Sequence, residues 1–180
     1  MDKLSQATLV LKKGGVVICP TDTVYGFLAD ASNKKAVDKI YKIKKRPKSD
    51  PLSIFVKDLK MVGELAEINE KQAKTLKKYW PGKYTFILKR KPSQKLYGLK
   101  KDSVAARIPK HAFLQKLLKK IDRPLAQTSV NISGKKNLDK VSDIIKQFGN
   151  QNILIIDDGD IKKGKPSKII NLTNNKVIRR

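Results

Sequence analysis

The order of apolar and polar residues along this chain changes repeatedly between a helical period and a strand period. Apolar residues three and four positions apart are typical of one buried face of a helix, whereas short β-branched runs are typical of buried strands. The helical period predicts helices over residues 3–13, 73–80, 113–121 and 141–148. It also predicts a helix that begins at a cap residue, Asn33, and ends before Pro47, and another that begins after Asp58. The strand-like runs occupy residues 16–19, 27–31, 52–56, 84–88, 104–108, 125–130, 153–156, 169–172 and 176–178.

Turn and breaker residues separate these segments. Gly14-Gly15 closes the first helix, Pro81-Gly82 closes another, and Asn174-Asn175 between the last two strand-like runs is typical of a hairpin. Strands and helices interleave without a long linker or an internal repeat. The sequence therefore predicts an α/β fold, a single domain over residues 1–180, with a twisted sheet of mixed parallel and antiparallel strands flanked by helices.

Composition narrows the class of protein. The 180 residues include one Cys and one His, which excludes an internal disulfide and a four-ligand zinc site built from these two types. No apolar run approaches the roughly 18 residues of a membrane span, and residues 1–10 lack the core of a signal peptide. We therefore expect a soluble, cytoplasmic protein.

The charge balance is strongly basic. The chain has 41 Lys plus Arg against 16 Asp plus Glu, a formal net charge of +25, and the basic residues are spread evenly. This pattern fits a lysine-coated soluble surface, and it fits equally a surface that attracts RNA or nucleotides. Only six of the 41 cations are Arg. These six positions draw attention because the guanidinium group offers a bidentate fork to phosphate or carboxylate that lysine does not.

Two short motifs are candidates for binding phosphate. Lys44 and Arg46 precede a proline, and if the backbone is extended there, both side chains point to one side and suit a polyphosphate. The alternative is a fraying, lysine-rich helix end. Ser129 and Asn131 lie at the end of a predicted strand, where alternation puts both on one side, and open α/β sheets bind ligands at such strand ends. Ordinary turn chemistry is the alternative there.

Arg107 lies inside an apolar strand. A buried charge is costly unless it is paired, so Arg107 pairs with a carboxylate of the protein or holds a carboxylate of a ligand. The small number of acidic residues favours the ligand.

These groups belong to an ordered series of motifs. Residues 13–26 read KGGVVICPTDTVYG, residues 40–47 read IYKIKKRP, and DPLS, WPG, RIP, SVNISG and PS follow at residues 50, 80, 107, 129 and 166. In this order, and over essentially the whole chain, they resemble the YrdC/TsaC family of threonylcarbamoyl-AMP synthases in its short, single-domain form.

The resemblance implies an activity and a set of site residues. L-threonine, bicarbonate and ATP would give threonylcarbamoyl-AMP and pyrophosphate, for modification of adenosine 37 in ANN-decoding tRNAs by a separate transferase complex. The residues that match the catalytic motifs are Lys44, Arg46, Ser129 and Asn131. Those that match further nucleotide-binding positions are Asp50, Ser103, Asn137 and Arg179. Those that match threonine-binding positions are Thr23, Tyr25 and Arg107, with Arg107 on the amino-acid carboxylate.

This chemistry requires no nucleophile from the protein. The threonine amine attacks CO2, the resulting carbamate attacks the α-phosphorus, and catalysis comes from orientation and from cations near the phosphates. Mg²⁺ is expected to be carried largely by the phosphate oxygens, without a set of protein ligands. Asp22 is a candidate for touching that ion, but a role in capping its own loop is favoured.

Several positions depart from the family pattern, and others are expected to have a structural role only. Asp50 stands where the family usually has Asn, Phe55 where it often has His, Asn137 where Ser is common, and Lys168 where Thr is usual. Cys19, Tyr79 and Trp80 are expected in the core, and His111 is expected to be a surface or helix-capping residue. Tyr25 suits either the threonine pocket or simple packing.

The basic charge and these departures leave one competing function, an RNA-binding YrdC-like paralogue that lacks synthase activity. Such a protein would bind RNA with an affinity that falls steeply with salt, and it would bind neither ATP nor threonine. Whether a synthase would itself touch tRNA or the transferase complex is left open by the sequence.

Overall fold

In a computed structural model, residues 1–92, 95–161 and 164–179 are described. The helices in these ranges are α1 (Lys3–Lys12), α2 (Lys34–Lys44), α3 (Leu59–Leu65), α4 (Glu70–Tyr79), α5 (Ala112–Ile121), α6 (Val141–Phe148) and a short 3-10 turn (Gly149–Gln151). The strands are β1 (Val17–Cys19), β2 (Gly26–Asp30), β3 (Ser53–Phe55), β4 (Ala66–Glu67), β5 (Tyr84–Arg90), β6 (Ser103–Arg107), β7 (Leu125–Ser129), β8 (Leu154–Ile155), β9 (Lys168–Asn171) and β10 (Lys176–Arg179).

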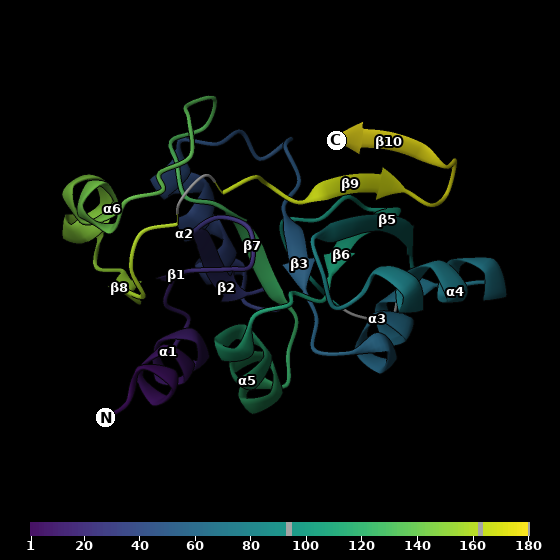
Figure 1. The fold of residues 1–180 in the computed structure, drawn as a ribbon, viewed down its shortest axis with the longest axis horizontal. Helices are drawn as coiled ribbons and strands as arrows, with labels where there is room; N and C mark the ends of the chain where they lie inside the picture. Colours follow the sequence, from purple (N-terminus) through teal and green to yellow (C-terminus); the bar gives the residue numbers. More distant parts are fainter. Residues whose placement is uncertain (93–94, 162–163, 180) are drawn as a thin grey trace.

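The strands form one sheet, which Figure 1 shows running from β8 on the left to β10 on the right. Its order is β10-β9-β5-β6-β3-β7-β2-β1-β8, and β4 pairs with β5 beside this path. The pairs β1/β8, β3/β6 and β5/β9 are parallel, and the remaining pairs are antiparallel. The prediction of an α/β fold with a mixed sheet is confirmed. The prediction that residues 1–180 make a single domain stays a prediction.

Side-chain caps fix where the helices begin. The carboxylate of Asp2, the amide oxygen of Asn33 and the carboxylate of Asp58 each accept a backbone N–H three residues later. Each such bond satisfies a donor that the helix itself cannot pair and contributes about 1 kcal/mol. The caps predicted at Asn33 and Asp58 are confirmed. His111 occupies the position before α5, but its side chain makes no capping bond, so the capping part of that prediction is wrong.

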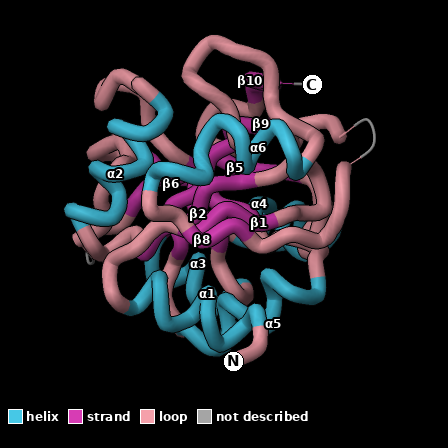
Figure 2. The backbone as a smooth tube through the Cα atoms, turned by 90° about the vertical axis from the view of Figure 1, so that its left-hand side faces the viewer, coloured by secondary structure: helices cyan, strands magenta, loops and turns pink. Residues whose placement is uncertain are grey.

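Strand alternation assigns the core residues to two faces of the sheet. Ile18, Phe27, Ile54 and Phe86 lie on one face, and α2, α3, α4 and α6 contribute the side chains packed against them. The other face presents Val17, Cys19, Leu28, Phe55 and Leu125 to α1 and α5. Figure 2 shows the sheet as a middle layer with α1 and α5 on one side and α2 and α6 on the other.

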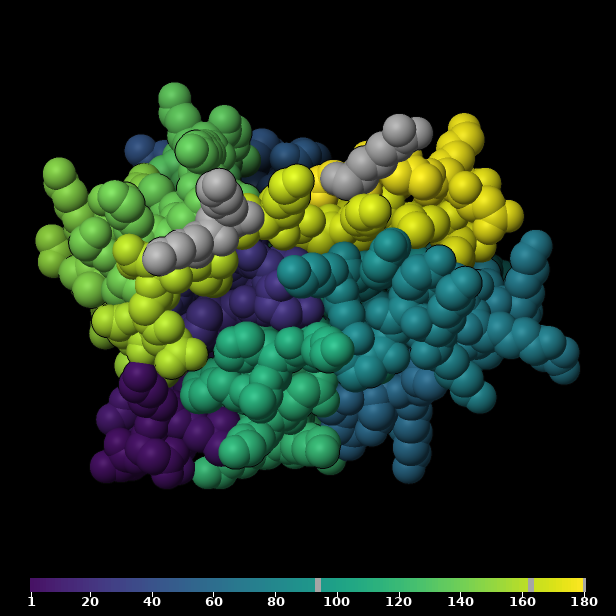
Figure 3. All heavy atoms as spheres, in the orientation of Figure 1, coloured from purple at the N-terminus to yellow at the C-terminus, as the bar shows by residue number. Residues whose placement is uncertain are grey.

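Helices α1 and α5 cover only one end of their face of the sheet. They lie side by side, purple and green, along the lower edge of Figure 3, and their apolar residues reach no further than β3 and β7. The same face also carries Ser53 on β3, Gln127 on β7 and Ser103 on β6, because paired residues of neighbouring strands share a face and every second residue of a strand lies on it. The strand face therefore changes from apolar to polar along its length, and the apolar residues of α1 and α5 do not pack on the polar part.

The chain between α2 and β3 differs from the expectation of an extended backbone. Lys44 is the last residue of α2, and Lys45 takes a left-handed conformation with φ 51° that ends the helix. Lys44 and Arg46 therefore do not follow the alternation of an extended chain, and that premise of the sequence interpretation is wrong. The short strand β4 and the 3-10 turn carry no pattern long enough to predict.

The buried aromatic group on β5 gives a test of the fold. Phe86 is fully buried and packs against Trp80 and Tyr79, with ring centroids 5.5 and 6.0 Å away. Phe86→Ala is expected to lower the free energy of unfolding by about 3–5 kcal/mol, because it removes a large side chain and leaves a cavity. Urea unfolding followed by circular dichroism measures this loss. Ile145→Ala, at a side chain that is 52% exposed, serves as control and should cost no more than about 0.5 kcal/mol.

Candidate active site

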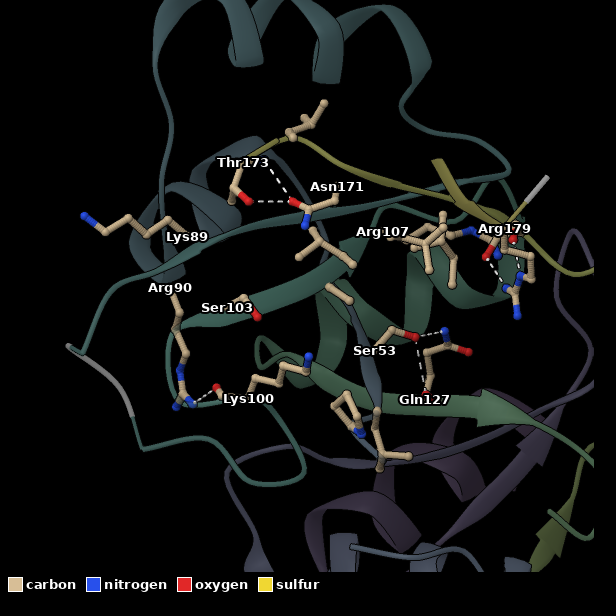
Figure 4. Close-up of a pocket in the computed structure, with 18 of the residues that line it drawn as sticks. Ser53, Lys89, Arg90, Lys100, Ser103, Arg107, Gln127, Asn171, Thr173 and Arg179 are labelled. Atoms are coloured by element: carbon tan, nitrogen blue, oxygen red, sulfur yellow. Dashed lines mark hydrogen bonds between the residues drawn. The ribbon is translucent and has the colours of Figure 1, made fainter. Parts of the chain in front are cut away.

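The uncovered part of the sheet is the floor of a cavity of about 1540 Å³. In the floor Ser53 pairs with Gln127, and Ile87 pairs with Ala105 on one side and Asn171 on the other. Helix α4 and the β9–β10 hairpin contribute further lining residues. Figure 4 shows Ser53, Ser103 and Gln127 on the floor, with Arg107 and Arg179 at one end and Lys89 at the other. Single-ligand pockets are usually about 300–1,000 Å³, so this cavity has room for two substrates together.

Seven residues that the sequence singled out line this cavity. They come from loops and strands far apart in the chain and are Thr23, Arg46, Asp50, Ser103, Arg107, Ser129 and Arg179. Among the described lining residues, Lys44, Tyr25, Asn131 and Asn137 are not found. The roles that the resemblance gives to these eleven residues stay predictions, but the structure divides them into seven residues that line the cavity and four that do not.

Arg107 is buried at the end of β6, with 2% of its surface exposed. Its Nε donates to the carbonyl of Gly82 at 2.9 Å, its Nη1 to Thr23 Oγ1 at 3.1 Å, and its Nη2 to a carboxylate oxygen of Asp22. Burial lowers the pKa of Arg107, and the Asp22 charge acts in the opposite direction. A carboxylate of the protein thus pairs with Arg107, which the sequence interpretation considered and ranked second. The guanidinium also lies over the Phe55 ring, 5.4 Å from its centroid.

The loop between β1 and β2 is capped by Thr21 and not by Asp22. Thr21 Oγ1 accepts the backbone N–H groups of Thr23 and Val24 at 3.0 and 3.2 Å and donates to the Val24 carbonyl. The carboxylate of Asp22 accepts instead from the backbone N–H of Lys110, outside its own loop. The expectation that Asp22 caps its own loop is therefore wrong. Thr21 holds the loop so that the Thr23 hydroxyl lies 2.9 Å from its own and within reach of Arg107.

Lys44 lies behind the cavity wall with 1% of its surface exposed. Its ammonium group donates to the carbonyl of Ser129 at 2.5 Å, to the carbonyl of Asn131 at 3.0 Å and to the Asn131 side-chain oxygen at 2.7 Å. An ammonium group has three N–H donors, so these bonds use all of them. Burial, with the Arg46 charge as a smaller cause, lowers the pKa of Lys44 to about 7.

The Ser129 and Asn131 side chains meet as strand alternation predicts. Ser129 Oγ donates to the Asn131 side-chain oxygen at 2.9 Å, while Asn131 Nδ2 donates to the carbonyls of Ile132 and Lys135. Lys44 and Asn131 together hold the turn after β7 from behind. Of this group only Ser129 lines the cavity.

Two further arginines line the cavity, Arg46 from the segment after α2 and Arg179 from β10. Arg46 is half-buried, and its guanidinium donates to the carbonyls of Asp50 and Pro51 at 3.2 and 3.0 Å. Arg179 on β10 donates to the carbonyl and the hydroxyl of Ser167 at 2.9 and 3.2 Å. All these acceptors are neutral oxygens, so both arginines keep a charge that a ligand anion can neutralise.

The remaining candidates lie elsewhere. Tyr25 is fully buried and its hydroxyl donates to the Gly159 carbonyl at 2.7 Å, while Asn137 is half-buried in the loop after the Ser129 turn. Cys19 and Trp80 are buried, as predicted, and burial raises the pKa of the Cys19 thiol. His111 is half-buried, and burial lowers its pKa.

Ser53, Gln127 and Ser167 are among the polar cavity residues to which the sequence interpretation gave no role. Gln127 Nε2 donates to Ser53 Oγ across the β3/β7 pair, and Ser167 Oγ lies 2.8 Å from Thr85 Oγ1. A polar side chain inside an apolar strand is a signal that could have identified Ser53 and Gln127. Ser167 was read only as a motif residue, because its loop has no periodic pattern.

In the described part of the chain no three His, Cys, Asp or Glu side chains lie close enough together to hold a metal ion. Within the same residues, none of the helices has both the length and the apolar character needed to cross a bilayer.

Comparisons with known proteins point to one family. The Sua5/YciO/YrdC family model, described as "Telomere recombination", matches residues 9–180. A protein of Methanocaldococcus jannaschii is 41% identical over 165 residues, which are 92% of this chain and 78% of that protein. The threonylcarbamoyl-AMP synthase of Vibrio vulnificus strain YJ016 is 30% identical over 185 aligned positions, covering 99% of this chain and 98% of the relative.

A solved structure shows the same fold. The crystal structure of Pyrococcus abyssi Sua5 complexed with L-threonine superposes with a TM-score of 0.88 and 34% identity over 95% of this chain. This chain spans 51% of that longer protein.

The buried ammonium of Lys44 predicts a pH dependence of stability. Its pKa of about 7 lies below the ordinary 10.5, so between these values the unfolded chain binds a proton that the folded chain has lost. The free energy of unfolding therefore rises with pH in this window, by at most about 1.4 kcal/mol per pH unit. Lys44→Met removes this contribution, so the wild type should gain stability relative to the variant between pH 7 and pH 9.

Urea unfolding of both proteins at pH 6, 7, 8 and 9 measures the difference. Lys42→Met, at an exposed position of the same helix, is the control and should keep the wild-type slope. Identical slopes for the wild type and Lys44→Met would contradict the assignment.

Proposed function

The chain belongs to the Sua5/YciO/YrdC family, and on this basis we propose that it is an L-threonylcarbamoyladenylate synthase. The observation that carries the proposal is the single cavity that gathers Thr23 and Arg107 with Arg46, Ser129 and Arg179. Arg107 suits the carboxylate of an amino-acid substrate, and Thr23 suits its hydroxyl. The other three offer cations and a hydroxyl to phosphate groups. The substrates are L-threonine, bicarbonate or CO2, and ATP.

The reaction has two steps. The amine of threonine forms a C–N bond to CO2 and loses a proton, which gives a carbamate. A carbamate oxygen then bonds to the α-phosphorus of ATP while the bond from that phosphorus to the bridging oxygen breaks, so pyrophosphate leaves with the electron pair. No side chain forms a covalent bond, so this chain contributes by placing the substrates and by stabilising charge.

Arg107 holds the amino-acid end. Within the described residues its hydrogen bonds use three of its five N–H donors, which leaves one on each terminal nitrogen. Two N–H donors on the terminal nitrogens match the two oxygens of a carboxylate. Thr23 lies beside them and offers its hydroxyl to the substrate.

Arg46, Ser129 and Arg179 hold the phosphate end. The arginines stabilise the charge that develops on the α-phosphate and on the leaving pyrophosphate. Lys44 and Asn131 act from behind, by fixing the turn that carries Ser129. Asp50 and Ser103 also line the cavity, and contacts of these residues and of Asn137 with the nucleotide stay predictions.

Mg²⁺ enters this proposal with ATP. We expect the ion to be held mainly by phosphate oxygens, because Mg²⁺ usually binds through substrate phosphates and at most one or two carboxylates. The ion would neutralise phosphate charge. Delivery of the product to a tRNA-modifying transferase, direct contact with tRNA and a cytoplasmic location belong to the same proposal and stay predictions.

The activity has a direct test. Purified protein with threonine, bicarbonate, Mg-ATP and pyrophosphatase is expected to release phosphate only when threonine is present, because pyrophosphate leaves only after the carbamate forms. A colorimetric phosphate assay measures the rate. Folded protein without threonine-dependent release would refute the synthase, and RNA binding that weakens steeply with salt would then favour the RNA-binding alternative.

Replacing Arg46 tests the phosphate end of the cavity. Arg46→Ala is expected to reduce turnover about 10- to 100-fold, because a charged hydrogen bond to phosphate contributes about 1.5–3 kcal/mol. Circular dichroism should show an unchanged fold, since Arg46 is only half-buried. Lys48→Ala is the control, because this lysine of the same segment pairs with Asp38 and should leave turnover within about twofold. Equal turnover in wild type and Arg46→Ala would remove Arg46 from the phosphate site.

A further inference from the structure

Asp22 joins three segments of the chain next to the amino-acid end of the cavity. It lies in the loop between β1 and β2, and 9% of its side chain is exposed. One carboxylate oxygen accepts from Arg107 Nη2 on β6, and the other accepts the backbone N–H of Lys110 at 3.1 Å. The carboxylate therefore links the loop that carries Thr23 to β6 and to the segment that precedes α5.

The contacts of Arg107 fix the orientation of its guanidinium completely. The Gly82 carbonyl holds Nε, the Thr23 hydroxyl holds Nη1 and the Asp22 carboxylate holds Nη2. Because the group is planar and its N–H bonds have fixed directions, three contacts at three nitrogens also determine where the two remaining N–H bonds point.

Of the three acceptors, only Asp22 carries a charge. A guanidinium with 2% exposure and only neutral acceptors would remain an uncompensated buried charge, which destabilises a protein strongly. Without Asp22, Arg107 would be free to turn toward solvent in the cavity or to lose its fixed orientation. The Gly82 carbonyl and the Thr23 hydroxyl do not supply the missing charge.

We propose that Asp22 is a positioning residue for substrate binding: it compensates the buried charge of Arg107 and fixes the guanidinium so that its two remaining N–H donors meet the carboxylate of the amino-acid substrate. This inference rests on the proposed function, because it takes the substrate to be an α-amino acid held by Arg107. Asp22 itself touches neither substrate nor reacting atoms.

The geometry distinguishes this role from competition. If Asp22 occupied the place of the substrate carboxylate, the substrate would have to displace it and break its bonds to Arg107 and to the Lys110 N–H. The two unused N–H donors of Arg107 make this displacement unnecessary. The two roles predict opposite signs, since removing a competitor strengthens substrate binding and removing a positioning group weakens it.

The test is Asp22→Asn, which keeps the shape of the side chain and removes its charge. We expect the KM for threonine to rise at least tenfold, while the KM for ATP and the kcat at saturating threonine stay within about threefold. Asp22→Glu restores the charge with a longer side chain, and its KM for threonine should lie between those of Asp22→Asn and the wild type.

A purely structural role is tested with a second Asp–Arg pair, at the end of β2, in which the Asp is buried and the Arg is 55% exposed. Asp30 is 5% exposed in its side chain and pairs with Arg123 Nη1 at 2.8 Å, and it is not among the described residues that line the cavity. Asp30→Asn should lower the melting temperature and leave the KM for threonine unchanged. If Asp22 acted only on stability, the two Asn variants would share one kinetic profile, and the proposal would be wrong.

A second measurement applies even where Asp22→Asn folds poorly. Threoninol has the amine and hydroxyl of threonine but no carboxylate. The ratio of its inhibition constant to the KM for threonine reports how strongly the site recognises the carboxylate. We expect this ratio to fall at least fivefold in Asp22→Glu and further in Asp22→Asn. If Asp22→Glu leaves both this ratio and the KM for threonine unchanged, the proposal is overturned.

The outcomes also separate this inference from the synthase proposal. A wild type without threonine-dependent pyrophosphate release refutes the synthase and, with it, the substrate that Asp22 is proposed to serve. If the wild type is active and Asp22→Asn has the same KM for threonine, the positioning role alone is refuted. If Asp22→Asn has a lower KM for threonine than the wild type, Asp22 is a competitor of the substrate.

Discussion

The buried charge of Arg107 is the constraint on which the candidate site depends. A guanidinium at the end of a central strand, with 2% of its surface exposed, is tolerated only if charge and hydrogen bonds compensate it. Asp22, Thr23 and Gly82 supply that compensation from two different loops. The course of both loops, and with it the shape of one end of the cavity, follows from the need to satisfy this one side chain.

Lys44 shows a different solution to the same problem. Its ammonium meets three neutral oxygens around the Ser129–Asn131 turn, so its hydrogen bonds are complete, but among the described residues no carboxylate pairs with its charge. Burial of this ammonium, with the Arg46 charge as a smaller cause, lowers its pKa to about 7. The two buried cations therefore differ in what they can do: Arg107 keeps two donors for a ligand, whereas Lys44 keeps none and acts on the turn that it supports. A motif that groups Lys44 with Arg46 thus combines a buried support with a residue that faces the cavity.

Much of the fold was predictable because its signals are local. Side-chain caps at Asn33 and Asp58, the apolar spacing of α5 and α6, and the Asn174-Asn175 hairpin depend on a few neighbouring residues. The cavity-facing role of Arg107 was also foreseeable, since a charge in an apolar strand needs an explanation. The orientation of Lys44 was not, because a left-handed Lys45 ends the helix and no sequence signal marks that residue. Ser53 and Gln127 face the cavity only because α1 and α5 stop short of them, and the extent of helix packing is a tertiary property.

One strand serves both the core and the site, and this couples them. On β6, Val104 and Ala106 face the core while Ser103, Ala105 and Arg107 face the cavity. A shift of one residue in the pairing of β6 would exchange the two sets and bury polar groups against Phe86. The register of the core thus fixes the position of Arg107. Acidic residues are scarce in a chain of net charge +25, and in the part of it that the structure describes Asp22 is the carboxylate that pairs with Arg107. The many surface lysines can change without moving this arrangement, whereas Asp22, Arg107 and the pairing of β6 have to be kept together.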